Sequence, residues 1–203
     1  MTIVHNTVRF IAAAALLVSA AVQARDTAPI RVRGEIVAVD ATTLTVRHSS
    51  GETVKIALAP DLAVGAVKNV KLADIQKGAF IGTATKLGPD GNQVAVEVLV
   101  FPESARGTGE GHYAWDLLPG SMMTNANVET VASGVQGRTL HLTYKGGSKD
   151  VVVPENTPVV TFAPATRADL LTGKKVFVVA KETAPGLSAT RVVVEKDGVA
   201  PPM

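Results

Sequence analysis

Residues 34–47 read GEIVAVDATTLTVR, and this stretch decides the expected fold. Large apolar side chains alternate with small or polar ones on both sides of a turn at Asp40-Ala41. This period of two is typical of strands that place one face on a core. Val, Ile and Thr are abundant, and their β-branched side chains suit a pleated surface. Further turn signals follow at Ser50-Gly51 and at residues 89–92 (PDGN), so the sequence predicts an all-β protein.

The same pattern returns in the second half of the chain at an offset of 94 to 97 residues. The matching pairs are 42–46 (TTLTV) with 138–142 (RTLHL), 73–78 (ADIQKG) with 168–173 (ADLLTG), and 79–86 (AFIGTATK) with 174–181 (KKVFVVAK). A register kept over several elements predicts an internal duplication. Within each copy, residues 74–78 and 169–173 are expected to form one helical turn, with Asp as N-cap and Gly as the stop.

Each copy supplies about five strands in roughly 70 residues. A sheet of that size removes its exposed edges by curling, so we expect two tandem five-stranded OB-like small barrels related by the duplication. Modules this small are marginally stable alone, and the two barrels are therefore expected to pack together. A single β-sandwich built from both copies is the alternative.

The chain begins like an exported protein. A mildly polar start is followed by the apolar run FIAAAALLV at residues 10–18 and by small residues ending in AVQA at 21–24, as in a cleaved secretory signal. The apolar stretch from Phe10 to Val22 is shorter than the roughly 20 residues that span a bilayer. Cysteine is absent, which excludes disulfides and thiolate metal sites. We expect a periplasmic protein that does not span the membrane.

The expected organisation has five parts. They are a signal peptide at 1–24, a first barrel repeat at 25–101, an ordered inter-repeat loop at 102–127, a second barrel repeat at 128–198, and a tail at 199–203.

Charge and aromatic content argue against nucleic-acid binding. The chain has 20 Lys and Arg against 18 Asp and Glu, and aromatic residues make up 4% of it. Nucleic-acid binders gather cations on one face and offer aromatic platforms for stacking, and neither feature is indicated here.

The order of motifs along the chain resembles that of a known group of proteins. The elements G-x-I-x-A-V-D, L-T-V and A-D-I-x-x-G, with GTGEGH, WD and PGSMMTNA between the repeats, resemble a family of uncharacterised bacterial exported proteins. Members carry tandem OB-like repeats of unknown function and are sometimes labelled metal-transporter permeases. The resemblance covers nearly the whole mature chain and implies a fold without an activity. The permease label does not fit a sequence that lacks a spanning segment.

Between the repeats the strand pattern stops, from Pro102 to Asn127. A connection of this length is usually either functional or disordered. Its apolar side chains are costly to leave in water, so we expect an ordered loop that packs them on one or both barrels. These side chains are Tyr113, Trp115, Leu117 and Leu118.

The same segment holds the one candidate metal site. His112, Met122 and Met123 lie near Trp115, the only tryptophan of the chain. This combination resembles the periplasmic copper and silver chaperones, which are small OB-like barrels, and it implies Cu(I) as a possible ligand. However, adjacent methionines point apart in an extended chain. The preferred interpretation is a hydrophobic plug between the barrels, because methionine fills irregular gaps well.

No pattern indicates an enzyme. The sequence has no G-x-S-x-G elbow, no H-E-x-x-H and no favourable Ser/His/Asp spacing. His48 and His141 are expected to face solvent, and Asp74 and Asp169 to serve in turns. We therefore expect a non-enzymatic exported binding or structural protein with a protein partner in the envelope. The alternative is a soft-metal binding or trafficking protein that uses the inter-repeat loop.

Overall fold

The computed structural model describes residues 28–134 and 137–202, which form thirteen β-strands and three short 3-10 turns, with no α-helix. The all-β prediction is therefore confirmed. The expected signal peptide at 1–24 lies outside the described residues.

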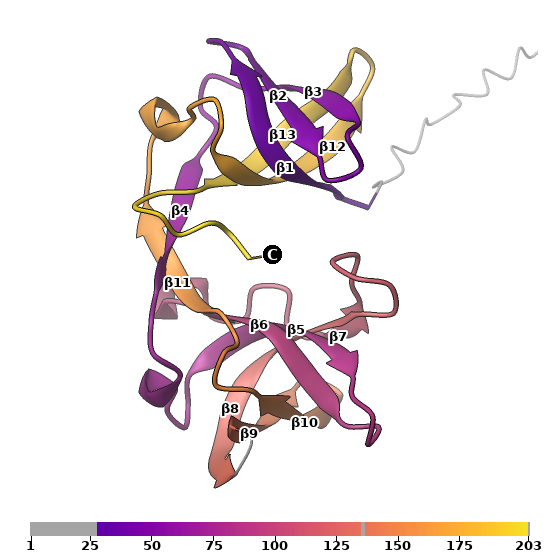
Figure 1. The fold of residues 1–203 in the computed structure, drawn as a ribbon, viewed down its shortest axis with the longest axis vertical. Helices are drawn as coiled ribbons and strands as arrows, with labels where there is room; N and C mark the ends of the chain where they lie inside the picture. The colour runs from indigo at the N-terminus through magenta and orange to yellow at the C-terminus, as the bar shows by residue number, and fades with distance from the viewer. Residues whose placement is uncertain (1–27, 135–136, 203) are drawn as a thin grey trace, which may run out of the picture.

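Five strands close into a barrel, here called the first barrel (Figure 1). Four antiparallel pairings follow the order β3-β2-β1-β12-β13, and a short parallel pairing of β13 with β3 closes the circuit. The strands are β1 (Ile30–Val39), β2 (Thr43–His48), β3 (Thr53–Ala57), β12 (Lys175–Thr183) and β13 (Gly186–Val194).

A second closed circuit of five strands, the second barrel, repeats this arrangement. Antiparallel pairings run in the order β10-β9-β8-β5-β6, and a parallel pairing of β6 with β10 completes it. The strands are β5 (Phe80–Leu87), β6 (Gln93–Val100), β8 (Met122–Gly134), β9 (Gly137–Tyr144) and β10 (Gly147–Val153).

Each barrel takes strands from both halves of the chain, which differs from the expected division at 25–101 and 128–198. The chain crosses from one barrel to the other along β4 (Val64–Asn69) and back along β11 (Val159–Pro164), and these two strands pair antiparallel (Figure 1). The alternation in the sequence assigns a strand to a core face but does not select its partner. Because the two halves carry similar apolar patterns, strands from either half can pack their apolar faces into the same core.

Three groups of buried side chains hold the molecule together. One fills each barrel, and the third lies where the crossing strands meet both barrels. Burying a side chain of this size contributes about 1.5–3 kcal/mol, so the third group links the barrels firmly. Its members are Val67, Leu99, Val160, Phe177 and Val193.

The two expected helical turns lie earlier than predicted. They are 3-10 turns, η1 at Leu72–Asp74 and η3 at Arg167–Asp169, and each ends at its aspartate instead of beginning there. The carboxylate reaches backwards: Asp169 Oδ2 accepts a hydrogen bond from the Thr166 N–H at 2.8 Å. The aspartates therefore close capping boxes from the third position of the turn.

The segment expected as an inter-repeat loop, 102–127, contains more regular structure than predicted. It includes η2 (Glu103–Ala105), β7 (Gly111–Ala114) and the first six residues of β8. The sequence does not predict the start of β8, because Thr124 and Asn125 are polar yet buried. Buried polar residues interrupt the apolar alternation by which a strand is recognised.

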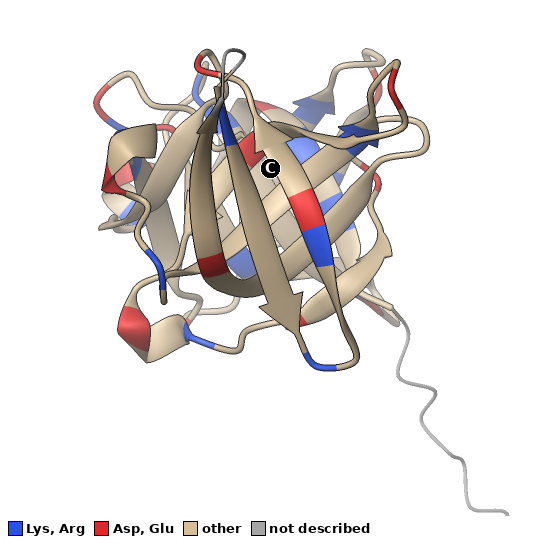
Figure 2. Cartoon of the chain, turned by 90° about the horizontal axis from the view of Figure 1, so that it is seen from below, with Lys and Arg blue, Asp and Glu red and all other residues tan. Residues whose placement is uncertain are grey.

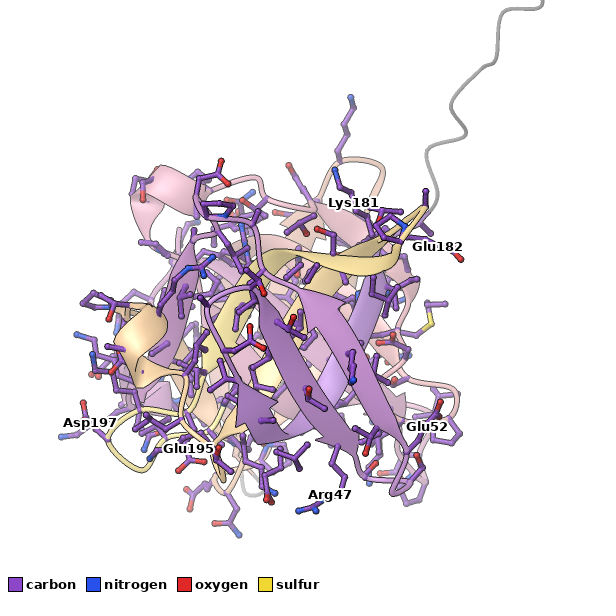
Figure 3. All side chains as sticks on the ribbon, turned by 90° about the horizontal axis from the view of Figure 1, so that it is seen from above. Arg47, Glu52, Lys181, Glu182, Glu195 and Asp197 are labelled. Atoms are coloured by element: carbon purple, nitrogen blue, oxygen red, sulfur yellow. The ribbon has the colours of Figure 1, made fainter. Side chains whose placement is uncertain are left out.

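Charged side chains are spread over the surface. Lys and Arg positions are interspersed with Asp and Glu positions in Figure 2, with most of the chain uncharged. Glu182 and Glu195 lie on opposite sides of the first barrel (Figure 3), and Glu195 is paired with Lys174 at 3.6 Å. Within 28–134 and 137–202, no helix has the length and hydropathy needed to cross a bilayer.

Candidate functional site

A cavity of about 200 Å³ lies between the two barrels, here called the inter-barrel cavity. Both barrels and the segment after β7 contribute to its lining. Most of the wall is apolar and much of it is aromatic, with rings from Phe101, Tyr113, Trp115, Phe162 and Phe177. Polar groups enter this wall at a few places only, as in many small-molecule sites.

Strand alternation and β-bulges place two charged residues at the cavity, Glu97 buried in its wall and Arg191 exposed at its edge. In β6, Glu97 and Leu99 face the cavity, whereas Val98 between them belongs to the core of the second barrel. The β5–β6 ladder slips by one residue next to Glu97, and the β12–β13 ladder slips in the same way next to Arg191. A bulge bends a strand and redirects its side chains. Glu97 and Arg191 thus occupy corresponding places in the two barrels.

Glu97 is the buried ionisable group of this site. It is 2% exposed, and its Oε2 has no hydrogen-bond partner among the described residues. Burial raises the pKa of Glu97 to about 8, and the positive charge of Arg33 only partly opposes this effect. Its carboxyl group is therefore predominantly protonated at neutral pH. The backbone is fixed nearby, because Thr83 Oγ1 donates a hydrogen bond to the Glu97 carbonyl at 2.7 Å.

Asn125 presents an acceptor to the cavity. Its Nδ2 donates hydrogen bonds to the Thr108 carbonyl at 3.0 Å and to the Tyr113 hydroxyl at 3.4 Å. Since a carbonyl can only accept, these contacts define the orientation of the amide. The opposite atom, Oδ1, is buried and has no partner among the described residues.

Two further buried polar atoms in the described part of the chain also lack a hydrogen-bond partner. They are Trp115 Nε1 and Arg33 Nε. The Arg33 guanidinium lies over the ring of Trp115 at 5.5 Å and over that of Phe177 at 5.0 Å, and both rings line the cavity. A buried polar group without a partner costs about 1–3 kcal/mol. Three of these four atoms belong to residues that line the cavity, Glu97, Trp115 and Asn125, and a bound molecule could satisfy them.

The Trp115 segment joins the two barrels at the cavity. The Arg31 guanidinium stacks on the indole of Trp115, 4.1 Å from the ring centroid. Next to it, Asp116 pairs with Arg33 at 2.8 Å and with Arg31 at 3.7 Å. Cation–π contacts contribute about 0.5–2 kcal/mol depending on desolvation, so this segment both closes the cavity and ties it to β1.

The structure brings together only part of the predicted metal set. In the β7–β8 ladder, Tyr113 lies opposite Met123, and both line the cavity near Trp115. Met122 precedes Met123 in the same strand and therefore faces the other way.

His112 is also engaged elsewhere. Its Nδ1 lies 2.8 Å from the Thr124 hydroxyl, its ring stacks near Tyr144, and burial lowers the pKa of the imidazole. Among the described residues no three His, Cys, Asp or Glu side chains are grouped as for a metal ion. His112, Met122 and Met123 thus do not converge on one point.

The other predicted loop residues divide between the cavity and the surface. Tyr113 and Trp115 line the cavity, whereas Leu117 is half-buried and Leu118 is 42% exposed. Outside the site, His141 is half-exposed on β9 and its Nδ1 lies 2.6 Å from Asp150.

Sequence reasoning missed Glu97, Arg191, Arg31 and Asn125. A signal was present for two of them. Glu97 is the one charged residue in the strand AVEVLV, and Arg191 is the one charged residue in the matching strand ATRVVV. A charge inside an apolar strand is a reason to expect a buried or functional group.

Comparison with models of protein families, with curated proteins and with solved structures finds no match for this chain. Function is therefore inferred from the cavity and from the residues that line it.

Proposed function

We propose that this chain is an exported, non-enzymatic binding protein that holds a small molecule in the inter-barrel cavity. One observation carries the proposal: among the described residues, three of the four buried polar side-chain atoms without partners belong to residues that line a mostly apolar cavity. A concave apolar site with a few convergent polar groups is the usual form of a small-molecule pocket. Each of these three atoms that gains a partner on binding recovers part of its desolvation cost.

We further propose that the two barrels are OB-like and arose by duplication. The element order β1-β2-β3-β4-η1-β5-β6 has the same form as β8-β9-β10-β11-η3-β12-β13, which supports this origin. The bulges next to Glu97 and Arg191 support it as well. An exchange of strands between the two copies then places the copies face to face, and the cavity lies between those faces.

The expected signal at 1–24 supports export to the periplasm. In that compartment, a protein partner in the envelope would deliver the ligand or receive it. Such a role needs reversible binding. The stacking and ion pairs that connect the Trp115 segment to β1 are non-covalent and can open and close.

Trp115 allows a direct test, because it is the only tryptophan and it lines the cavity. We would titrate the mature chain with fluorophenylacetamide, a neutral aromatic probe, and follow Trp115 emission and the fluorine NMR signal. Saturable binding is expected in the wild type. Val179→Phe, which adds a ring at the cavity wall, should weaken it by about tenfold or more.

The matched control is Leu87→Phe, because Leu87 is 67% exposed and does not line the cavity. This variant should bind the probe as the wild type does. The proposal is refuted if the probe does not bind at millimolar concentration, or if Val179→Phe and Leu87→Phe bind it equally.

A further inference from the structure

We propose that the inter-barrel cavity selects a small aromatic monocarboxylate, with its ring against the aromatic wall and its carboxylate near Arg31 and Arg191. This inference rests on the proposed function and specifies the class of ligand. Size, charge and the unpaired polar atoms each point to this class.

The volume sets the size of the ligand. A cavity of roughly 150 Å³ in a protein core is known to take up a benzene molecule. The inter-barrel cavity, at about 200 Å³, therefore has room for one six-membered ring and a short substituent. Rings of Tyr113, Trp115 and Phe177 line it, and aromatic pairs gain about 0.5–1.5 kcal/mol beyond the burial of their area.

The charges at the cavity favour an anion. Arg31 lines the cavity and Arg191 contributes to its lining from an exposed position. The described carboxylate paired with Arg31 is that of Asp116, at 3.7 Å. Asp116 lies closer to Arg33, at 2.8 Å, and no described carboxylate forms an ion pair with Arg191. The negative charge of Asp116 is therefore divided between Arg31 and Arg33, and the cavity keeps a net positive charge from Arg31 and Arg191.

The remaining acidic group of the wall does not cancel this positive charge. Glu97 is buried, and its raised pKa keeps the carboxyl group mostly neutral near pH 7. A cationic ligand would therefore meet Arg31 and Arg191 in the cavity lining, and Asp116, the carboxylate paired with Arg31, is not part of that lining. A carboxylate, by contrast, forms charge-assisted hydrogen bonds with guanidinium groups, often as a bidentate pair.

The buried polar atoms without partners also favour an aromatic monocarboxylate as the ligand. The indole N–H of Trp115 and a protonated Glu97 are both donors, and a carboxylate oxygen is their natural acceptor. Asn125 Oδ1 is the one unpaired acceptor, and a hydroxyl or amino substituent on the ring would satisfy it.

The test compares three probes of nearly equal shape on the full mature chain near neutral pH. Fluorophenylacetate is the anion, fluorophenylacetamide its neutral counterpart, and fluorophenethylamine the cation. Fluorine NMR and Trp115 emission measure each dissociation constant. The acid should bind about tenfold more tightly than the amide, and the amine more weakly than both.

Variants then test whether Arg191 is responsible for the preference for the acid. Arg191→Gln should raise the dissociation constant of the acid about tenfold, and Arg191→Lys, which keeps the charge, should recover much of the difference. Lys181→Gln is the matched control, because Lys181 is an exposed cation of the first barrel that lies outside the cavity (Figure 3). It should leave all three constants unchanged.

The outcomes separate this inference from the proposed function. Equal binding of acid and amide, with both sensitive to Val179→Phe, overturns the inference and leaves the proposed function standing. Equal losses in Arg191→Gln and Lys181→Gln also overturn it, because they indicate general electrostatic attraction. If none of the probes binds, the inference and the proposed function both fail.

Discussion

Replacing Glu97 by glutamine is expected to remove a pH dependence of folding stability that originates at the cavity. The pKa of Glu97 rises from 4.5 to about 8 on folding because the side chain is buried. Between these two values the unfolded chain releases a proton that the folded chain keeps. The folded state binds more protons in this window, so the free energy of unfolding of the wild type falls as the pH rises.

The magnitude follows from the width of the window. One proton contributes about 1.4 kcal/mol per pH unit, so the full span from 4.5 to about 8 is on the order of 5 kcal/mol. Typical domains are stable by about 5–15 kcal/mol, and this loss is therefore large. Glutamine has the shape of the protonated acid and does not titrate. Glu97→Gln should match the wild type below pH 4.5 and exceed its stability by several kcal/mol above pH 8.

Urea unfolding followed by circular dichroism, at steps between about pH 5 and about pH 8.5, gives both stability profiles. Burial lowers the pKa of His112, but this imidazole is present in both proteins and its contribution cancels in the difference. Burial raises the pKa of Tyr113 away from the window.

The control is Glu129→Gln, because Lys77 lowers the pKa of Glu129 and moves its titration below the range. Parallel profiles of the wild type and Glu97→Gln would refute the reasoning. They would mean that Glu97 is ionised in the folded protein and is held by Arg33.

Three other outcomes are expected. Gly82→Ala should destabilise the fold by about 1–3 kcal/mol in urea, since its Cβ would lie 2.6 Å from an amide oxygen, whereas Gly65→Ala, with a nearest contact of 4.0 Å, should be nearly neutral. Asp116→Asn should cost no more than about 1 kcal/mol, because the carboxylate is half-exposed, yet it should shift Trp115 emission as the arginine stacking rearranges. Ag(I) should give no saturable quenching of Trp115 at micromolar concentration; one-to-one quenching that is lost in Met122→Ala would contradict the geometry described for β8.

Alternation allowed the sequence to predict strands and their buried faces. In residues 44–47, Leu44 and Val46 are fully buried, whereas Thr45 and Arg47 are not. The period of two carries this information because each strand places one face on its own core. The position of the turns at Gly78 and Gly173 was predictable for a similar reason, since both glycines adopt a positive φ near 87°.

The cavity could not be predicted in this way. Glu97 and Leu99 belong to the outer face of β6, and alternation alone assigns that face to solvent. Only the exchange of strands between the two halves brings the outer face of one barrel against that of the other. Arg31, Glu97 and Arg191 come from three distant parts of the sequence. The repeat offset relates Glu97 to Arg191, but it does not indicate that the two residues meet at one cavity.

The proposed duplication would account for the uneven distribution of charge between the two barrels at the cavity. Counted from the bulges in β1 and β8, Arg31 corresponds to Met123 and Arg33 to Asn125, just as Arg191 corresponds to Glu97. The first barrel has a cation at all three places, and the second has an apolar, a neutral polar and a buried acidic side chain. Identical copies with three arginines each would repel one another across the cavity. Under the proposed duplication, divergence at these places removes that repulsion and leaves the cations on the first barrel opposite uncharged side chains and a buried acid on the second. This asymmetry suits the apolar anion that we propose as ligand.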